Sequence, residues 1–145
     1  MNTTHTGSCL CGGIHFSIMG PLEPVQVCHC SQCRRAQGGP VATNIPVPSS
    51  AVTFLRGDSL LRHYESSPGK VRAFCSVCGS PVYSRRDALP GVLRIRAGLL
   101  HEPVATALAF EAFADSKASW WPLLGNIPAH PDSAPAHAPA PGPDR

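Results

Sequence analysis

The chain has 145 residues and a formal charge of +3 at pH 7, and 14% of its residues are charged. This length predicts a single domain, and no apolar run reaches the ~20 residues that a membrane-spanning helix needs. The 16 prolines and 13 glycines favour many turns and few long helices.

The first segment, residues 1–6, is polar and contains no basic region followed by an apolar one. It therefore lacks the features of a secretory signal, and we expect a cytoplasmic protein in a reducing compartment. Cysteines in such a compartment are more often metal ligands or catalytic groups than disulfide partners. The cysteines of this chain are therefore interpreted first as metal ligands.

The next part of the chain, up to about residue 97, alternates short apolar runs with turn residues, as all-β folds do. A short helical turn is expected at residues 31–37, where Gly38 and Gly39 would end it, and an irregular turn at 116–121. We therefore expect a mainly β fold with little helix. The predicted strands are 13–18, 25–29, 41–46, 52–55, 60–64, 71–74, 81–84 and 92–97.

The composition changes near residue 128. Beyond it, proline and alanine dominate without apolar periodicity, and such a tract favours extended conformations over a packed face. We therefore expect one domain over residues 1–128 and a disordered Pro/Ala-rich tail over 129–145. At least one of Trp120 and Trp121, just before this boundary, is expected in the core.

Two of the three cysteine clusters have spacings that suit one metal ion. Cys9 and Cys11 are two residues apart, so both side chains point to one side of an extended strand. Cys75 and Cys78 flank a turn, and Gly79 just beyond can adopt a positive φ. Four thiolates complete the closed tetrahedron of a structural zinc site. Buried thiols or a disulfide pair are the alternatives.

The middle cluster, Cys28, Cys30 and Cys33, supplies three thiolates and leaves one position open. Three protein ligands and a vacancy are typical of catalytic or ligand-binding zinc. Strand alternation directs His29 away from these sulfurs, so we expect it to pack or to hydrogen bond behind the site. An exogenous fourth ligand is favoured. A Cys30–Cys33 disulfide and a cluster without metal are the alternatives.

The donor set also indicates the kind of ligand. Zinc with three thiolates is a weak Lewis acid that suits a soft ligand, and a thiol bound to it is deprotonated. The cluster therefore predicts a small thiol or thiol adduct as substrate. Two zinc ions with seven thiolates would reduce the formal charge from +3 to zero, which argues against a nucleic-acid partner. No membrane partner is expected, and the sequence leaves the oligomeric state open.

Four segments resemble motifs of the glutathione-dependent formaldehyde-activating enzyme family, which includes centromere protein V. Three of them hold the cysteine clusters in the family's order, which makes the resemblance specific. In the fourth, Ser119 precedes Trp120 where the family often has proline. The likeness extends over about residues 7–128. The four segments are residues 7–12, 28–34, 74–80 and 115–120.

The resemblance implies an Mss4-like fold of short antiparallel sheets around a structural zinc. The family's reaction joins glutathione and formaldehyde into S-hydroxymethylglutathione, a carbon–sulfur lyase activity. Arg34 is the candidate for contacting a glutathione carboxylate, because arginine can hold a carboxylate in a bidentate fork. The implied structural zinc ligands are Cys9, Cys11, Cys75 and Cys78, and the implied catalytic zinc ligands are Cys28, Cys30 and Cys33.

Other classes of function compete with this one. A non-enzymatic zinc module that binds glutathione or a protein partner is the main alternative. A thiol redox protein using Cys30 and Cys33 is disfavoured, because such motifs usually belong to a βαβ pattern. A nucleic-acid-binding zinc ribbon is disfavoured because the chain lacks a basic stripe interleaved with aromatic residues.

Overall fold

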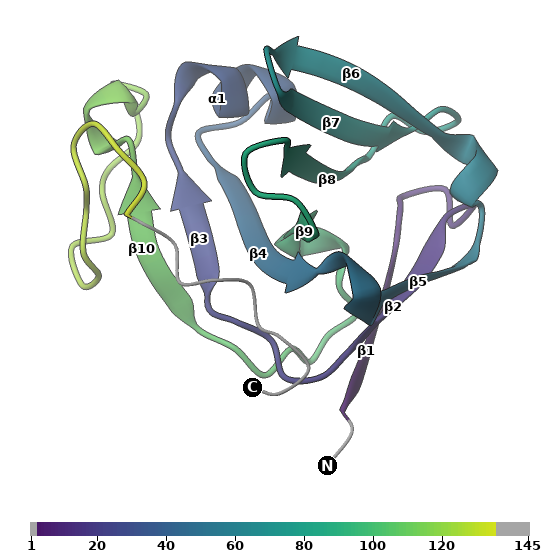
Figure 1. Cartoon of the computed structure of the whole chain (residues 1–145). Helices are drawn as coiled ribbons and strands as arrows, with labels where there is room; N and C mark the ends of the chain where they lie inside the picture. Colours follow the sequence, from purple (N-terminus) through teal and green to yellow (C-terminus); the bar gives the residue numbers. More distant parts are fainter. Residues whose placement is uncertain (1–2, 136–145) are drawn as a thin grey trace.

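The computed structural model describes residues 3–135, and its architecture is mainly β (Figure 1). Within these residues seven strands form one large sheet. Neighbouring strands in this sheet run antiparallel, except for the first two strands in the order given next, which are parallel to each other. Their order in space is β10 (Leu108–Ala112), β3 (Val25–Cys28), β4 (Ala42–Pro48), β9 (Val92–Arg96), β8 (Pro81–Arg86), β7 (Lys70–Cys75) and β6 (Leu61–Ser67).

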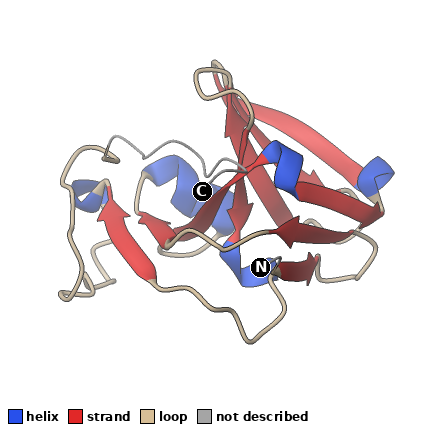
Figure 2. Cartoon of the chain, turned by 60° about the horizontal axis from the view of Figure 1, so that its bottom comes forward, coloured by secondary structure: helices blue, strands red, loops and turns tan. Residues whose placement is uncertain are grey.

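A second sheet in the described chain has three antiparallel strands, in the order β1 (Thr4–Ser8), β2 (His15–Met19) and β5 (Val52–Arg56). The helical segments are short and lie between the strands (Figure 2). They are α1 (Ser31–Gln37), η1 (Ser49–Ala51), η2 (Asp58–Leu60), η3 (Ala97–Leu99) and η4 (Ala114–Ser116). The expectation of a mainly β fold with antiparallel sheets and little helix is confirmed.

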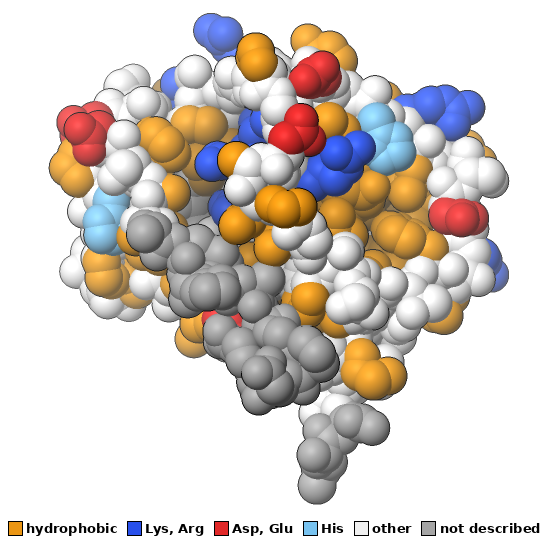
Figure 3. Space-filling model, viewed as in Figure 1, with side chains coloured by type: hydrophobic (Ala, Val, Ile, Leu, Met, Phe, Trp, Pro, Cys, Tyr) orange, Lys and Arg blue, Asp and Glu red, His pale blue; other side chains and the backbone are white. Residues whose placement is uncertain are grey.

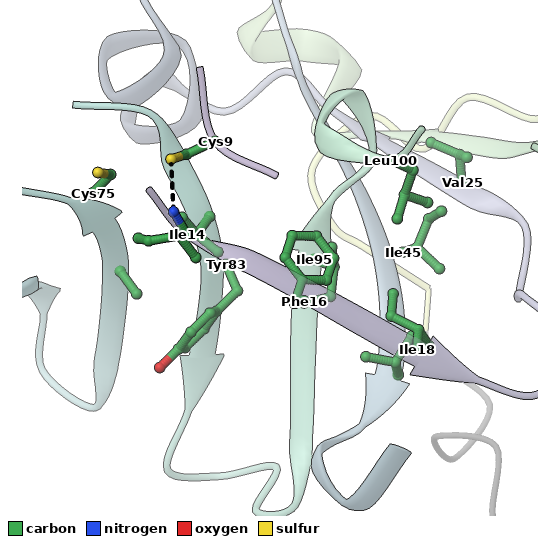
Figure 4. Close-up of a cluster of buried hydrophobic side chains, with 13 residues drawn as sticks. Cys9, Ile14, Phe16, Ile18, Val25, Ile45, Cys75, Tyr83, Ile95 and Leu100 are labelled. Carbon is green, nitrogen blue, oxygen red and sulfur yellow. Dashed lines mark hydrogen bonds between the residues drawn. The ribbon is translucent and has the colours of Figure 1, made fainter. Parts of the chain in front are cut away.

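The core lies between the two sheets. Phe16 and Ile18 on β2 are fully buried and pack in one cluster with Ile45 on β4 and Ile95 on β9 (Figure 4). Full burial of such a side chain contributes about 1.5–3 kcal/mol. At one end of this cluster the Ile14 backbone N–H donates to Cys9 Sγ at 3.3 Å, so the apolar core directly supports the first cysteine cluster.

The eight predicted strands and the helical turn at 31–37 are confirmed. Two strands were not predicted. β1 is polar in sequence and depends on its neighbour, because Gly7 allows close contact with Phe16, whose Cζ would lie 2.5 Å from an added Cβ. β10 is rich in alanine and pairs in parallel with β3, a partner remote in sequence. The alternation of apolar and polar residues along the sequence shows neither the pairing of β1 nor that of β10.

The expectation for the tryptophans was wrong. Trp120 is 68% exposed and Trp121 is 39% exposed. Both follow η4 in an irregular segment, where Lys117 Nζ donates to the Trp121 carbonyl at 3.0 Å. The two rings contact each other edge to face rather than a core. Their position outside the sheets therefore keeps both rings at the surface.

The first residues of the expected tail form backbone hydrogen bonds with residues 111–115. The Glu111 N–H donates to the Pro128 carbonyl and the His130 N–H donates to the Glu111 carbonyl, each at 2.8 Å. Ala129 forms a parallel bridge with Glu111. The chain therefore continues beside β10 after residue 128. The rest of the expected tail, residues 136–145, lies outside the described residues, and the domain boundary at 128 stays a prediction.

No helix in the described part of the chain has the length and apolar character needed to cross a membrane.

Two glycines with the same backbone conformation allow a test of how the turn after β5 supports the first cysteine cluster. Gly57 has φ +81°, and a Cβ there would lie 1.9 Å from the Gly13 carbonyl oxygen; Gly91 has φ +79° and open space around it. We expect Gly91→Ala to lower the free energy of unfolding by about 1–2 kcal/mol, from the positive φ alone. Gly57→Ala should cost about 1–3 kcal/mol more because of the steric clash. Urea unfolding measures both, and equal losses would contradict the proposed close contact.

Candidate functional site

The first candidate metal site is formed by Cys9, Cys11, Cys75 and Cys78, whose sulfur atoms all lie within 4.8 Å of one another. The sulfur of Cys11 lies 3.6 Å from that of Cys9 and 3.9 Å from that of Cys75. Zinc–sulfur bonds in a tetrahedron place sulfur atoms about 3.8 Å apart. The four side chains therefore fit a tetrahedral zinc ion.

Backbone and hydroxyl groups around this cluster hydrogen bond to its sulfur atoms. The N–H of Gly13 donates to Cys11 Sγ at 3.4 Å, and the N–H of Val77 donates to Cys75 Sγ at 3.4 Å. The Ser80 hydroxyl lies 3.2 Å from Cys78 Sγ, and this hydrogen bond lowers the pKa of Cys78 to about 5. Thiolates are the form in which cysteine binds zinc.

The second candidate site is formed by Cys28, Cys30 and Cys33, again with all sulfur atoms within 4.8 Å. Cys28 ends β3, Cys30 caps the N-terminus of α1, and Cys33 lies in its first turn. The Cys33 N–H donates to Cys30 Sγ at 3.3 Å, so the cysteine itself provides the helix cap. No fourth cysteine, histidine or carboxylate joins this group within residues 3–135.

The pKa values of two thiols in this cluster, Cys33 and Cys28, are shifted in opposite directions. Hydrogen bonds from the Cys28 and Cys30 thiols, and then the positive charges of Lys70 and Arg72, hold the pKa of Cys33 well below its usual range. The same crowding by Cys30 and Cys33, together with burial, raises the pKa of Cys28. All the cysteines lie in the described chain, and none forms a disulfide. The disulfide alternatives are therefore not adopted.

His29 is fully buried and hydrogen bonds behind the site, as the strand alternation predicted. Its Nε2 lies 2.8 Å from Glu111 Oε1. The other carboxylate oxygen accepts the Leu124 N–H at 3.0 Å. His29 and Glu111 thus connect the end of β3, β10 and the segment after η4, and neither residue lines the cavity into which the cysteines open.

The three cysteines open into a cavity of about 460 Å³. Ala112 and Phe113 form an apolar part of its wall, while Lys and Arg side chains gather in and beside the hollow seen near the middle of the face in Figure 3. The basic residues of the wall are Lys70, Arg72, Arg86 and Arg94.

Strand register places these basic residues together. Ala73, Tyr83 and Ile95 are opposite one another on β7, β8 and β9 and face the core. Because side chains alternate along a strand, the next paired set, Arg72, Ser84 and Arg94, faces the other side of the sheet. That side forms the wall of the cavity, and burial there lowers the pKa of Lys70 to about 8.

Arg72 and Arg94 each donate to nearby side chains. Arg72 donates from Nε to Ser66 Oγ at 2.9 Å and from Nη2 to Cys33 Sγ at 3.9 Å. Arg94 donates from Nη2 to Gln26 Oε1 at 2.9 Å. Arg72 therefore joins the cationic wall directly to the cysteine cluster.

Arg34, the predicted carboxylate contact, is placed differently. Its Nε donates to the Ser116 carbonyl at 3.2 Å, which ties α1 to η4, and it is not among the residues that line the cavity. The basic residues on β7, β8 and β9 were missed. A signal existed, because Arg94 and Arg96 are two positions apart in a predicted strand and so share one of its faces.

Comparison with known proteins supports the family resemblance. A family model described as "Glutathione-dependent formaldehyde-activating enzyme" matches residues 4–116. A protein of Halomonas elongata that is named for the same enzyme is 34% identical over 85 residues. The match covers 53% of this chain and 53% of the relative, so the chain spans about half of that relative's length. A crystal structure of a Rhodobacter sphaeroides protein has a similar fold, with a TM-score of 0.60 and 22% identity over 86% of this chain and 99% of that one.

Removing one sulfur from each cluster should have different consequences. Native mass spectrometry of the intact chain is expected to find two zinc ions, one for each cluster. Cys75→Ser should remove one ion and lower Tm by roughly 10 °C or more, because a structural zinc contributes several kcal/mol to folding. Cys30→Ser should also remove one ion but leave Tm within about 5 °C of the wild type. Global unfolding of Cys30→Ser with a stable Cys75→Ser would mean that the two roles are reversed.

Proposed function

Since the chain belongs to the glutathione-dependent formaldehyde-activating enzyme family, we propose that it joins glutathione, or a similar small thiol, to formaldehyde. The reaction forms a carbon–sulfur bond between the thiol sulfur and the carbonyl carbon, and the thiol proton ends on the carbonyl oxygen. In the reverse direction the same chemistry is a carbon–sulfur lyase reaction. A cytoplasmic location fits this proposal, because glutathione keeps that compartment reducing.

The observation that carries the proposal is the three-sulfur cluster with no fourth protein ligand in the described chain, open to a cavity. A zinc ion held by Cys28, Cys30 and Cys33 would supply an open position at which a thiol binds as thiolate. Arg72, which donates to Cys33 Sγ at 3.9 Å, stabilises the negative charge that collects there. Ala112 and Phe113 add apolar groups to the cavity beside this cluster.

We assign a structural role to the other cluster. A zinc ion bound by Cys9, Cys11, Cys75 and Cys78 would join parts of the chain that are 64 residues apart, because Cys11 and Cys75 contact each other. The ion would sit where the turn before β2 meets the turn after β7. It would therefore hold the two sheets together without contacting substrate.

The reaction can be tested by proton NMR of glutathione and formaldehyde mixed with the zinc-loaded chain. We expect adduct formation to be faster than without protein, and Cys30→Ser to lower this acceleration by about 100-fold or more, since it removes one ligand of the open site. Ser31→Ala, at the neighbouring exposed position, is the control and should match the wild type. Glutathione binding without any acceleration would support the non-enzymatic module instead.

A further inference from the structure

We propose that the cationic wall, defined as Lys70, Arg72, Arg86 and Arg94, selects thiol substrates that carry two carboxylates. The proposal deepens the proposed function and rests on it for the choice of a thiol as ligand. It replaces Arg34, which points to Ser116, as the source of carboxylate recognition. Thiols that are neutral or carry only an amine would be rejected by this wall.

The strand register arranges the wall in two rows. In the inner row, Arg72 on β7 and Arg94 on β9 flank Ser84 on β8. Ser84 is buried and small and accepts from Arg96 Nη1 at 3.4 Å, while Arg72 and Arg94 on either side of it both line the cavity. Strands are about 4.8 Å apart, so the two arginine backbones are separated by about twice that distance. Two long side chains at this separation can approach one carboxylate from both sides.

In the outer row, Lys70 on β7 is directly opposite Arg86 on β8. Like charges at directly opposed positions of an antiparallel pair destabilise a sheet. Arg86 is exposed at the mouth of the cavity, whereas Lys70 is half-buried. An anion bound between them would relieve this repulsion, and this gives the second carboxylate site.

Unsatisfied donors also point to a missing anion. Arg72 is only 8% exposed, and its Nη1 has no hydrogen-bond partner among the described residues; the same holds for Arg94 Nε. A guanidinium group stays charged, so a buried N–H without an acceptor carries a full desolvation cost. Arg72 Nε already donates to Ser66, and Arg94 Nη2 already donates to Gln26. A carboxylate in the cavity would satisfy the donors that remain.

Charge balance leads to the same ligand. Three thiolates and one zinc ion carry a net charge of −1 and the lining residue Asp87 carries −1, so the four cations of the wall leave a surplus of +2. Asp87 is the lone carboxylate among the described lining residues, and it is exposed and 3.9 Å from Arg85, outside the wall. A ligand with two carboxylates offsets this surplus. The cavity of about 460 Å³ has the size of a small-molecule site.

The test uses binding rather than turnover. S-methylglutathione keeps both carboxylates but has no free thiol, and its diethyl ester has the same skeleton with both carboxylates masked. By calorimetry with the zinc-loaded full chain, we expect the Kd of the diester to be at least about tenfold higher, because charge-assisted hydrogen bonds are lost. Equal affinity for the two compounds, or no binding of S-methylglutathione, would overturn the proposal.

Neighbouring arginines on β8 provide matched variants. Arg86 lines the cavity and Arg85 does not, while both are exposed. Arg86→Gln should raise the Kd of S-methylglutathione about tenfold and leave that of the diester unchanged. Arg85→Gln should leave both within about twofold, as expected for a surface charge. Equal effects of the two variants would indicate general electrostatic attraction and overturn the assignment.

The two proposals can fail separately. Charge-selective binding without acceleration of adduct formation would support the cationic wall and reject the enzyme function. Equal kcat/KM for glutathione and glutathione diethyl ester would support the enzyme function and overturn the cationic wall.

Discussion

The four-sulfur cluster of Cys9, Cys11, Cys75 and Cys78 is the constraint on which the arrangement of the two sheets depends. It brings the segment before β2 against the turn that follows β7, and the buried core begins directly beside it, where Ile14 donates to Cys9. Four sulfurs at such distances repel one another as thiolates unless a cation lies between them. The fit to a tetrahedral zinc ion is therefore also an explanation of how this end of the core is stable.

The large sheet uses its two faces for different purposes. One face carries Ala73, Tyr83 and Ile95 into the core, and the other carries Arg72, Ser84 and Arg94 toward the cavity. Arg96 continues this second face and donates to Asn44 and Ser84, and burial lowers its pKa to about 10. Buried guanidinium groups held by neutral partners are costly, so the positive potential they create is best explained by its action on anions in the cavity.

The cysteine triplet depends on a different set of contacts. α1 is capped at its N-terminus by Cys30, whose sulfur accepts the Cys33 N–H. It is capped at its C-terminus by Gly38, which has a left-handed backbone and donates its N–H to the Arg34 carbonyl. On the opposite side, the His29–Glu111 pair holds the parallel strand β10 and the segment around Leu124 against β3. The triplet is therefore supported both by its own short helix and by a part of the chain that is about 80 residues away.

The sequence by itself determined the features that depend on local spacing. The cysteine clusters, the helix at 31–37, eight strands and the direction of His29 away from the cysteine sulfurs follow from residue types and from the period of strands and helices. The parallel pairing of β10, the exposure of Trp120 and the displacement of Arg34 from the cavity were decided only by the tertiary structure. The cationic wall was also decided only by the tertiary structure. Its members are on three strands, and only strand order and register bring Lys70 opposite Arg86 and place Arg72 and Arg94 on either side of Ser84. Side-chain alternation along a strand determines which face of the sheet a side chain is on, but not which residue of another strand lies beside it.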